Sequence, residues 1–137
     1  MTKEEIRLKE VEDKIIIVRN QKVLVASDVA KLYGVGTRDI NKSVKNNPEK
    51  FPEGYIIVLT QGEKKEVVEN FHHLKSLKYS PQPPNAFTEK GLYMLATILK
   101  SPKATATTLA IIDTFSKIRE LSNVLSEITI TKDNSKQ

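Results

Sequence analysis

The order of apolar and polar positions along the chain predicts short strands followed by several helices. Residues 15–18 and 22–25 are two apolar runs rich in β-branched side chains, and the polar residues 19–21 lie between them. That pattern is typical of a β-hairpin. Residues 55–59 have the same apolar character and predict a further strand.

Two short helices are predicted between the hairpin and this further strand. Ser27 is the expected N-cap of the first helix. Gly34 ends it, because glycine readily adopts the left-handed backbone found at a helix C-terminus. Thr37 is the expected N-cap of the second helix, which covers residues 38–46.

The middle of the chain predicts one more helix and then a loop. Thr60 and Glu63 have the spacing of a capping box, and the helix that they begin reaches about residue 71. Residues 73–85 include several prolines and predict a mobile loop.

A pair of helices is predicted after this loop. Thr88 is the expected cap of the first, with Phe87 packing on Leu92 as a hydrophobic staple. Ser101 followed by Pro102 is a helix-start signal for the second, which is expected to reach about residue 125.

The last helix carries two apolar series. The residues expected to face the core are Leu109, Ile112, Phe115 and Ile118. The spacing of a short coiled-coil seam is found at Ile118, Leu121, Leu125 and Ile128. A homodimer contact and burial against the same domain both fit this seam. The polar tail is expected to fray from residue 129 onward.

These elements predict one α+β domain: a small β-hairpin or sheet, a helix-turn-helix and a C-terminal helical pair. Its expected organisation is a charged N-terminal leader at residues 1–13, the domain itself at residues 14–125 and a polar tail at residues 126–137.

Composition narrows the function classes. The 137 residues carry a net charge of +5 and include no cysteine, so disulfides and thiolate metal sites are excluded. No apolar run approaches the roughly 18 residues that a membrane span needs, and we expect a cytoplasmic protein with no membrane partner. The positive charge suits a polyanion such as nucleic acid, or serves solubility alone.

The segment 26–46 carries the functional prediction, because a helix, a glycine-containing turn and a second helix form the DNA-reading motif. The second helix buries only Ile40 and Val44. The predicted DNA-binding residues are Ser27, Thr37, Arg38, Asn41, Lys42, Lys45 and Asn46.

Their side-chain chemistry fits a major groove, since arginine pairs with guanine, asparagine with adenine, and lysine with phosphate. A solvated helix surface is the alternative interpretation. Asp39 is the only acidic residue between Arg38 and Asn47, which favours the interpretation as a DNA-reading helix.

Other constellations are weaker. His72 and His73 are adjacent, so on a helix they point in different directions and are expected to be surface residues, not metal ligands. The lysines at positions 64, 65, 75 and 78 either contact phosphate or are simply solvated. No spacing brings acid–base or nucleophilic groups together, so we expect no enzyme activity, no cofactor and no metal.

Two blocks of sequence resemble a known family. The first is Lys22-Val23, Ser27-Asp28-Val29-Ala30-Lys31-Leu32-Tyr33-Gly34-Val35, Arg38, Asn41, Val44-Lys45 and Phe51-Pro52. The second is Ala86-Phe87-Thr88-Glu89-Lys90-Gly91-Leu92-Tyr93-Met94-Leu95-Ala96. Together they resemble the ORF-six N-terminal domain of phage regulatory proteins, which is grouped with the KilA N-terminal (KilA-N) and baculovirus BRO N-terminal (BRO-N) domains. The resemblance covers roughly residues 14–122.

The resemblance implies a mixed α+β DNA-binding domain of phage, prophage and bacterial proteins that regulates transcription or acts as an antirepressor. Residues 71–85 depart from the family pattern, which often has a more basic, glycine-containing stretch there. We therefore expect a sequence-specific regulator that binds double-stranded DNA, with Arg38, Asn41 and Lys42 on base edges. The alternative is a protein-interaction module that binds a repressor through the C-terminal seam or the proline-containing loop.

Overall fold

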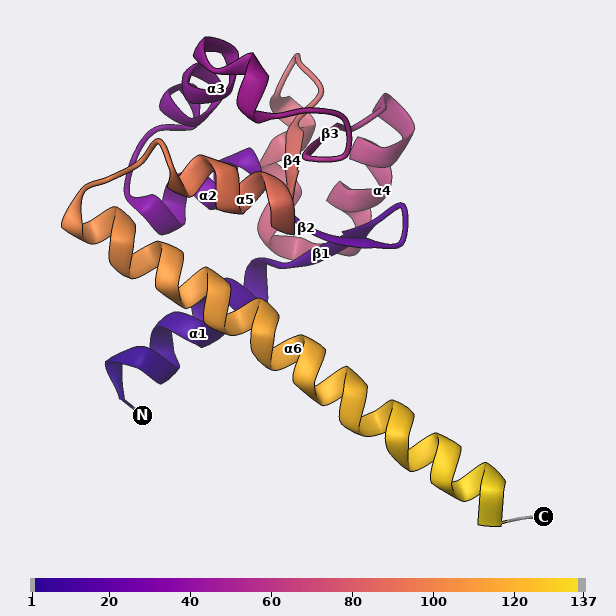
Figure 1. Ribbon diagram of the computed structural model, residues 1–137. Coiled ribbons are helices and arrows are strands. Elements are labelled where there is room, and N and C mark those ends of the chain that lie inside the picture. The colour runs from indigo at the N-terminus through magenta and orange to yellow at the C-terminus, as the bar shows by residue number, and fades with distance from the viewer. Residues whose placement is uncertain (1, 136–137) are drawn as a thin grey trace.

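The computed structural model describes the backbone of residues 2–135 and the side chains of residues 2–125. It is an α+β domain in which helices cover both faces of a small antiparallel sheet (Figure 1). The α-helices are α1 (Lys3–Lys14), α2 (Ala26–Tyr33), α3 (Thr37–Asn46), α4 (Gln61–Asn70), α5 (Glu89–Ala96) and α6 (Pro102–Ser135). The strands are β1 (Ile16–Val18), β2 (Gln21–Val25), β3 (Ile56–Val58) and β4 (Asn85–Thr88). Two 3-10 helices, η1 (Pro48–Lys50) and η2 (His72–Tyr79), complete the described elements.

The sheet has the order β1-β2-β4-β3, with every neighbouring pair antiparallel. The predicted hairpin forms β1 and β2, and its turn has positive φ at Arg19 and Asn20, as a two-residue hairpin turn of type I′ requires. Strand β4 was not predicted. It lies between β2 and β3, with Leu24 opposite Phe87 and Ile56 also opposite Phe87.

Alternate residues of the central strands point into two separate cores. Leu24 and Phe87 lie in the first core, which α1, α2, α5 and α6 complete. Val25 and Ala86 lie in the second core, which is closed by Val67 of α4 and by residues of η2. Since successive side chains of a strand point to opposite faces, both faces of β2 and β4 are buried.

Glu63 joins the hairpin to α4. Its carboxylate accepts two hydrogen bonds from the Arg19 guanidinium, both 2.8 Å long, and one of 2.9 Å from the Thr60 amide. The Thr60 hydroxyl accepts one of 3.1 Å from the Glu63 amide, which confirms the predicted capping box. Hydrogen bonding by Arg19, followed by Thr60, lowers the pKa of Glu63 to about 2.

Several expectations are corrected at the ends of the chain. From Lys3 onward the residues of the predicted charged leader lie in helix α1, which buries Val11 and packs on α6. Helix α6 begins as predicted, with the Ser101 hydroxyl accepting from the Ala104 amide at 3.0 Å. It continues to Ser135, beyond the predicted end near residue 125 and through the tail that was expected to fray.

The predicted inward face of α6 is partly wrong. Leu109 and Ile112 are 55% and 37% exposed, whereas Ile111 and Phe115 are buried. The helix is therefore rotated relative to the predicted stripe, because its inward face is set by α1, α2 and α5. The side chain of Ile128 lies outside the described residues.

The segment expected to be a mobile loop is also corrected, since η2 occupies its first half and Leu74 is buried there. Thr88 caps α5 as predicted, and its hydroxyl accepts from the Gly91 amide at 3.3 Å. Phe87, expected to pack on Leu92 at the helix entrance, lies in the same core as Leu92. It is also part of β4, which was not predicted because the strand partners of β4 are distant in sequence.

Gly91 permits the close approach of α5 to the segment before β3. A Cβ atom at Gly91 would collide with the carbonyl oxygen of Tyr55. The amide and hydroxyl of Thr88 both donate to this same oxygen, at 3.2 and 3.0 Å, so it has little freedom to move.

We expect Gly91→Ala to lower the free energy of unfolding by about 1–3 kcal/mol, as overpacking typically does. Replacing glycine by alanine in a helix ordinarily raises the free energy of unfolding by about 1 kcal/mol. A decrease in Gly91→Ala would therefore indicate the collision with Tyr55. The measurement is urea denaturation followed by circular dichroism. Gly62→Ala in α4 is the matched control, because a Cβ there meets only the Thr60 hydroxyl, at 3.9 Å. Equal stability of the two variants would contradict the argument.

Candidate nucleic-acid interface

Helices α2 and α3 are joined by a turn of three residues, Gly34 to Gly36. Gly34 has φ 70°, and the Val35 amide donates to the Ala30 carbonyl at 3.0 Å, which closes the end of α2. The Asp39 carboxylate accepts from the Gly36 amide at 3.1 Å at the start of α3. The predicted turn is therefore present, and its glycine conformation is the expected one.

Both predicted N-caps in this segment are shifted by the structure. Val25 is the cap of α2 and Gly36 is the cap of α3, and neither makes a side-chain capping bond. Ser27 is consequently the second residue of α2, and Thr37 is the first residue of α3. The reason at α2 is that β2 runs into the helix without a loop.

Helix α3 has a buried face and an exposed face. Ile40 is fully buried, and Val44 packs against the first core. On a helix of 3.6 residues per turn, Arg38, Lys42 and Asn46 lie on the opposite side. All three are exposed. The structure therefore brings these three predicted residues together on one outward surface.

The other four predicted residues lie elsewhere. Ser27, Thr37, Asn41 and Lys45 line a hollow of about 380 Å³ between α3 and the segment that precedes β4. The facing wall consists of residues that the sequence did not single out: Leu77, Ser80, Gln82, Pro83, Pro84 and Asn85. None of the described residues that line this hollow is acidic.

Asn41 is the point of contact between the two walls. The side-chain amide of Asn85 donates to the Asn41 side-chain oxygen at 3.3 Å. Asn41, which was predicted to contact a base edge, therefore already has a hydrogen-bond partner in this structure. The polar residues of a proline-containing loop were the only sequence signal for this wall, and no local pattern placed it opposite α3.

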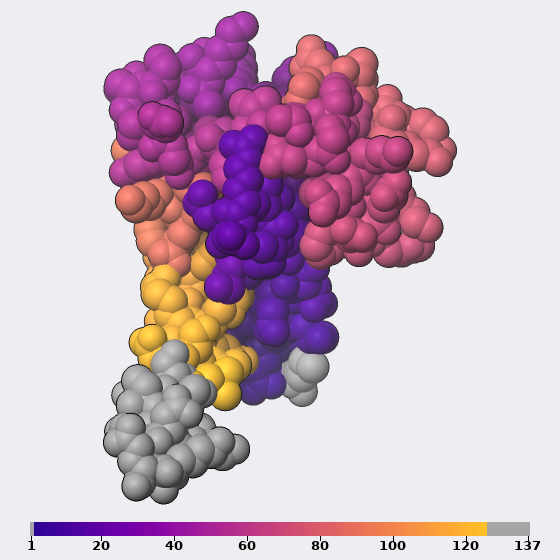
Figure 2. Space-filling model, turned by 90° about the vertical axis from the view of Figure 1, so that its right-hand side faces the viewer, coloured from indigo at the N-terminus to yellow at the C-terminus, as the bar shows by residue number. Residues whose placement is uncertain are grey.

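Figure 2 shows how these parts lie on the surface. Helix α3 and the segment of residues 80–85 project at the same end of the molecule, with a depression between them. Helices α1 and α6 lie towards the other end (Figure 1).

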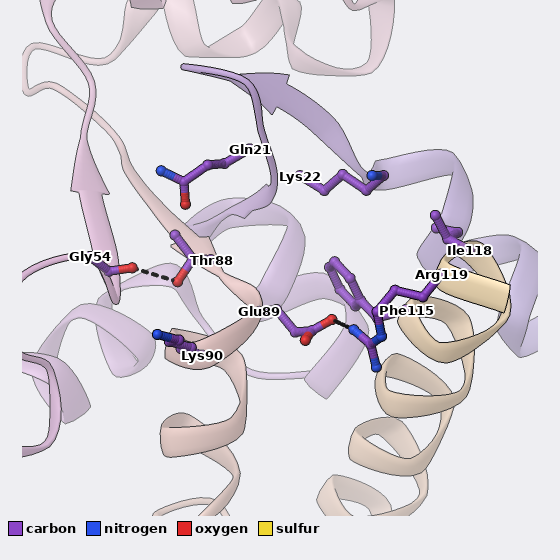
Figure 3. Close-up of a pocket in the computed structure, with 9 residues that line it drawn as sticks. All are labelled: Gln21, Lys22, Gly54, Thr88, Glu89, Lys90, Phe115, Ile118 and Arg119. Carbon is purple, nitrogen blue, oxygen red and sulfur yellow. Dashed lines mark hydrogen bonds and ion pairs between the residues drawn. The ribbon is translucent and has the colours of Figure 1, made fainter. Parts of the chain in front are cut away.

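A further hollow, of about 490 Å³, lies away from α3 (Figure 3). Its lining comes from β2, from the end of β4, from the start of α5 and from α6, together with Gly54, and includes no residue of α2 or α3. Glu89 within it is ion-paired with Arg119. The Thr88 hydroxyl lies 2.9 Å from the Gly54 carbonyl oxygen and shares its single proton between this oxygen and the carbonyl oxygen of Tyr55. The acidic side chain of this hollow is thus already partnered.

Asp28 of α2 is fully buried and contacts His73 of η2, with 3.0 Å between its Oδ2 and the imidazole Nε2. Burial raises the pKa of the Asp28 carboxyl, while His73, Lys14 and Lys31 act in the opposite direction. Its other oxygen has no hydrogen-bond partner among the described residues. His73 is exposed, as predicted, and it also links η2 to α2, the helix that precedes α3.

We expect Asp28→Asn to change how stability depends on pH. Because the folded-state pKa is raised, the contribution of Asp28 is fully present below the unfolded pKa and is lost as the pH rises through the folded pKa. Asparagine does not titrate, so the variant does not lose stability in this way. The difference in free energy of unfolding, variant minus wild type, should therefore increase as the pH rises from about 4 towards neutrality.

Urea denaturation at a series of pH values measures the difference. Asp13→Asn, on the exposed part of α1, is the control for removal of one carboxylate. A constant difference between Asp28→Asn and the wild type across this range would show that the buried carboxylate does not titrate as argued.

None of the helices in the described part of the chain has the length and apolar character needed to cross a bilayer. The described residues also contain no group of three or more histidine, cysteine, aspartate or glutamate side chains arranged to hold a metal ion.

Fold and surface together define an α+β domain that presents a basic helix after a three-residue turn. A model of the ORF6N domain family matches residues 13–98, which include the hairpin, α2, α3, both inner strands and α5. The chain therefore belongs to the ORF6N domain family, the ORF-six N-terminal domain that its sequence resembles. Comparison with curated proteins and with solved structures gave no match.

Proposed function

We propose that this chain is a phage-type transcriptional regulator that binds double-stranded DNA by inserting α3 into the major groove. The observation that carries the proposal is the outward surface of α3, where Arg38, Lys42 and Asn46 are exposed opposite the buried Ile40. A helix of this kind fits the width of the major groove. Membership of the ORF6N family supports a phage-type regulatory role.

The side chains have different tasks in this proposal. Arg38 contacts a base edge, because its planar guanidinium forms two parallel hydrogen bonds with guanine. Lys42 contacts a base edge or a neighbouring phosphate. Lys45, Thr37 and Ser27, on the side of the hollow, position the phosphate backbone. Nothing in this mechanism requires catalysis, a cofactor or a metal.

Asn41 requires one rearrangement. To reach adenine, its amide must exchange the 3.3 Å hydrogen bond with Asn85 for hydrogen bonds to the base. This exchange couples base contact by α3 to the position of the segment before β4.

We expect the double variant Arg38→Ala, Lys42→Ala to weaken DNA binding at least tenfold, since each base contact is worth about 1–3 kcal/mol. The measurement is a gel-shift titration at several salt concentrations, with duplexes selected by the wild type from a random pool. Arg7→Ala, Lys9→Ala on α1 is the matched control, with the same change in charge far from α3 (Figure 1). Unchanged affinity and salt slope in the α3 variant would refute the assignment.

We also propose that a second copy of the chain binds the outer part of α6. Leu121 and Val124 are 61% and 46% exposed there, where α6 extends past the rest of the domain (Figure 1). A two-fold pair would present two α3 helices to a symmetric site about one helical turn apart.

Sedimentation velocity tests this contact. We expect a dimer for the wild type, a monomer for Leu121→Glu, and a dimer for Leu109→Glu, an equally exposed leucine nearer the start of α6. A monomeric wild type would contradict the dimer. It would favour the alternative in which this domain is an antirepressor and the same surface binds a repressor.

A further inference from the structure

A second hollow, of about 550 Å³, lies between α4 and η2. It is lined by Gln61, Lys64, Lys65, Val68, Glu69, Lys75 and Lys78. Four of these seven residues are lysines and one is acidic, so the hollow has a strong positive bias.

The backbone that carries these lysines is held at both ends of η2. At its start, His73 contacts the buried Asp28 of α2, and Leu74 is buried in the second core. Just after its end, the carbonyl of Ser80 accepts a hydrogen bond from the Lys64 ammonium. Lys75 and Lys78 therefore extend from a fixed support.

The lysines differ in solvent exposure and in whether their ammonium groups already have a hydrogen-bond partner in the fold. Lys64 is only 8% exposed, and its ammonium is used to hold Ser80. Lys65, Lys75 and Lys78 are exposed. These three are the candidates for contact with an anion.

The position of this hollow relative to α3 identifies the anion. The end of η2 is a wall shared by two hollows: Leu77 and Ser80 line the one beside α3, and Lys78 lines the one beside α4. Figure 2 shows the segment 80–85 next to this wall, projecting at the same end as α3. The two hollows are therefore neighbours across η2, and an extended polyanion in contact with α3 is the ligand that this placement favours.

We propose that the hollow between α4 and η2 binds the sugar–phosphate backbone of the same duplex whose bases α3 contacts. The proposal rests on the DNA-binding function proposed above and adds a second contact to it. Lysine ammonium groups attract phosphate without distinguishing bases. This contact therefore contributes affinity, salt dependence and register, while α3 provides the sequence preference.

The test is the triple variant Lys65→Ala, Lys75→Ala, Lys78→Ala. Lys64 is left unchanged because it supports the fold. We expect the slope of log K against log salt to become shallower by about 1–3, since each phosphate contact contributes about 0.9. Affinity should fall at least tenfold at low salt, and the preference among selected duplexes should stay as in the wild type.

The matched control is Lys3→Ala, Lys9→Ala, Lys117→Ala, which removes the same charge from exposed positions of α1 and α6. A slope that changes only in the α4–η2 variant supports the proposal. Phosphate-ethylation interference should also lose signals on one flank of the site in that variant alone.

Two different results would overturn the inference, and they distinguish failure of the lysine contact from failure of the proposed DNA-binding function. An unchanged salt slope in the α4–η2 variant, with DNA binding still weakened at least tenfold by the α3 variant, removes this contact and leaves the proposed function intact. A wild type that binds no duplex at low salt overturns the function and this inference together.

Discussion

The pairing of β2 with β4 is the interaction on which the rest of the structure depends. These strands form the middle of the sheet, and their side chains are buried on both faces. Leu24 and Phe87 enter one core, while Val25 and Ala86 enter the other. Helix α2 follows β2 directly and α5 follows β4 directly, so the pair fixes where both helices start.

The position of α3 follows from this pair through a short chain of contacts. Buried α2 and the three-residue turn determine the direction of α3, and Ile40 anchors it to the first core. On the other side of this hollow, β4 fixes the end of the segment that faces α3. The candidate interface thus has two walls: α3, which β2 supports through α2, and the segment before β4, which β4 supports.

Local signals were sufficient for much of this fold. The hairpin, the glycine turn before α3, the Thr60–Glu63 capping box and the start of α6 depend on residues close together in sequence, and the structure confirms them. The exposed surface of α3 follows from helical periodicity alone. Local signals placed the caps of α2 and α3 one or two residues too late. At α2 the reason is that β2 runs directly into the helix, so no side-chain cap is needed there.

Other features depend on contacts distant in sequence, which no local pattern reveals. Strand β4 is short, and only its pairing with β2 and β3 makes it a strand. Helix α1 has a single buried residue, Val11, and packs on α6 more than ninety positions later in the sequence. The same limit applies to the site: Asn85 reaches Asn41, and His73 reaches Asp28, only once the sheet is complete.

The late place of β4 in the chain has a consequence for synthesis on the ribosome. Helix α1, the hairpin, α2 and α3 leave the exit tunnel before β4, and β2 and β3 share no direct pairing until this strand joins them. Until residues 85–88 emerge, Val25 and Leu24 lack their covering partners, and α3 has no opposite wall. A nascent chain therefore completes the sheet that supports its interface only when most of the family domain is already translated.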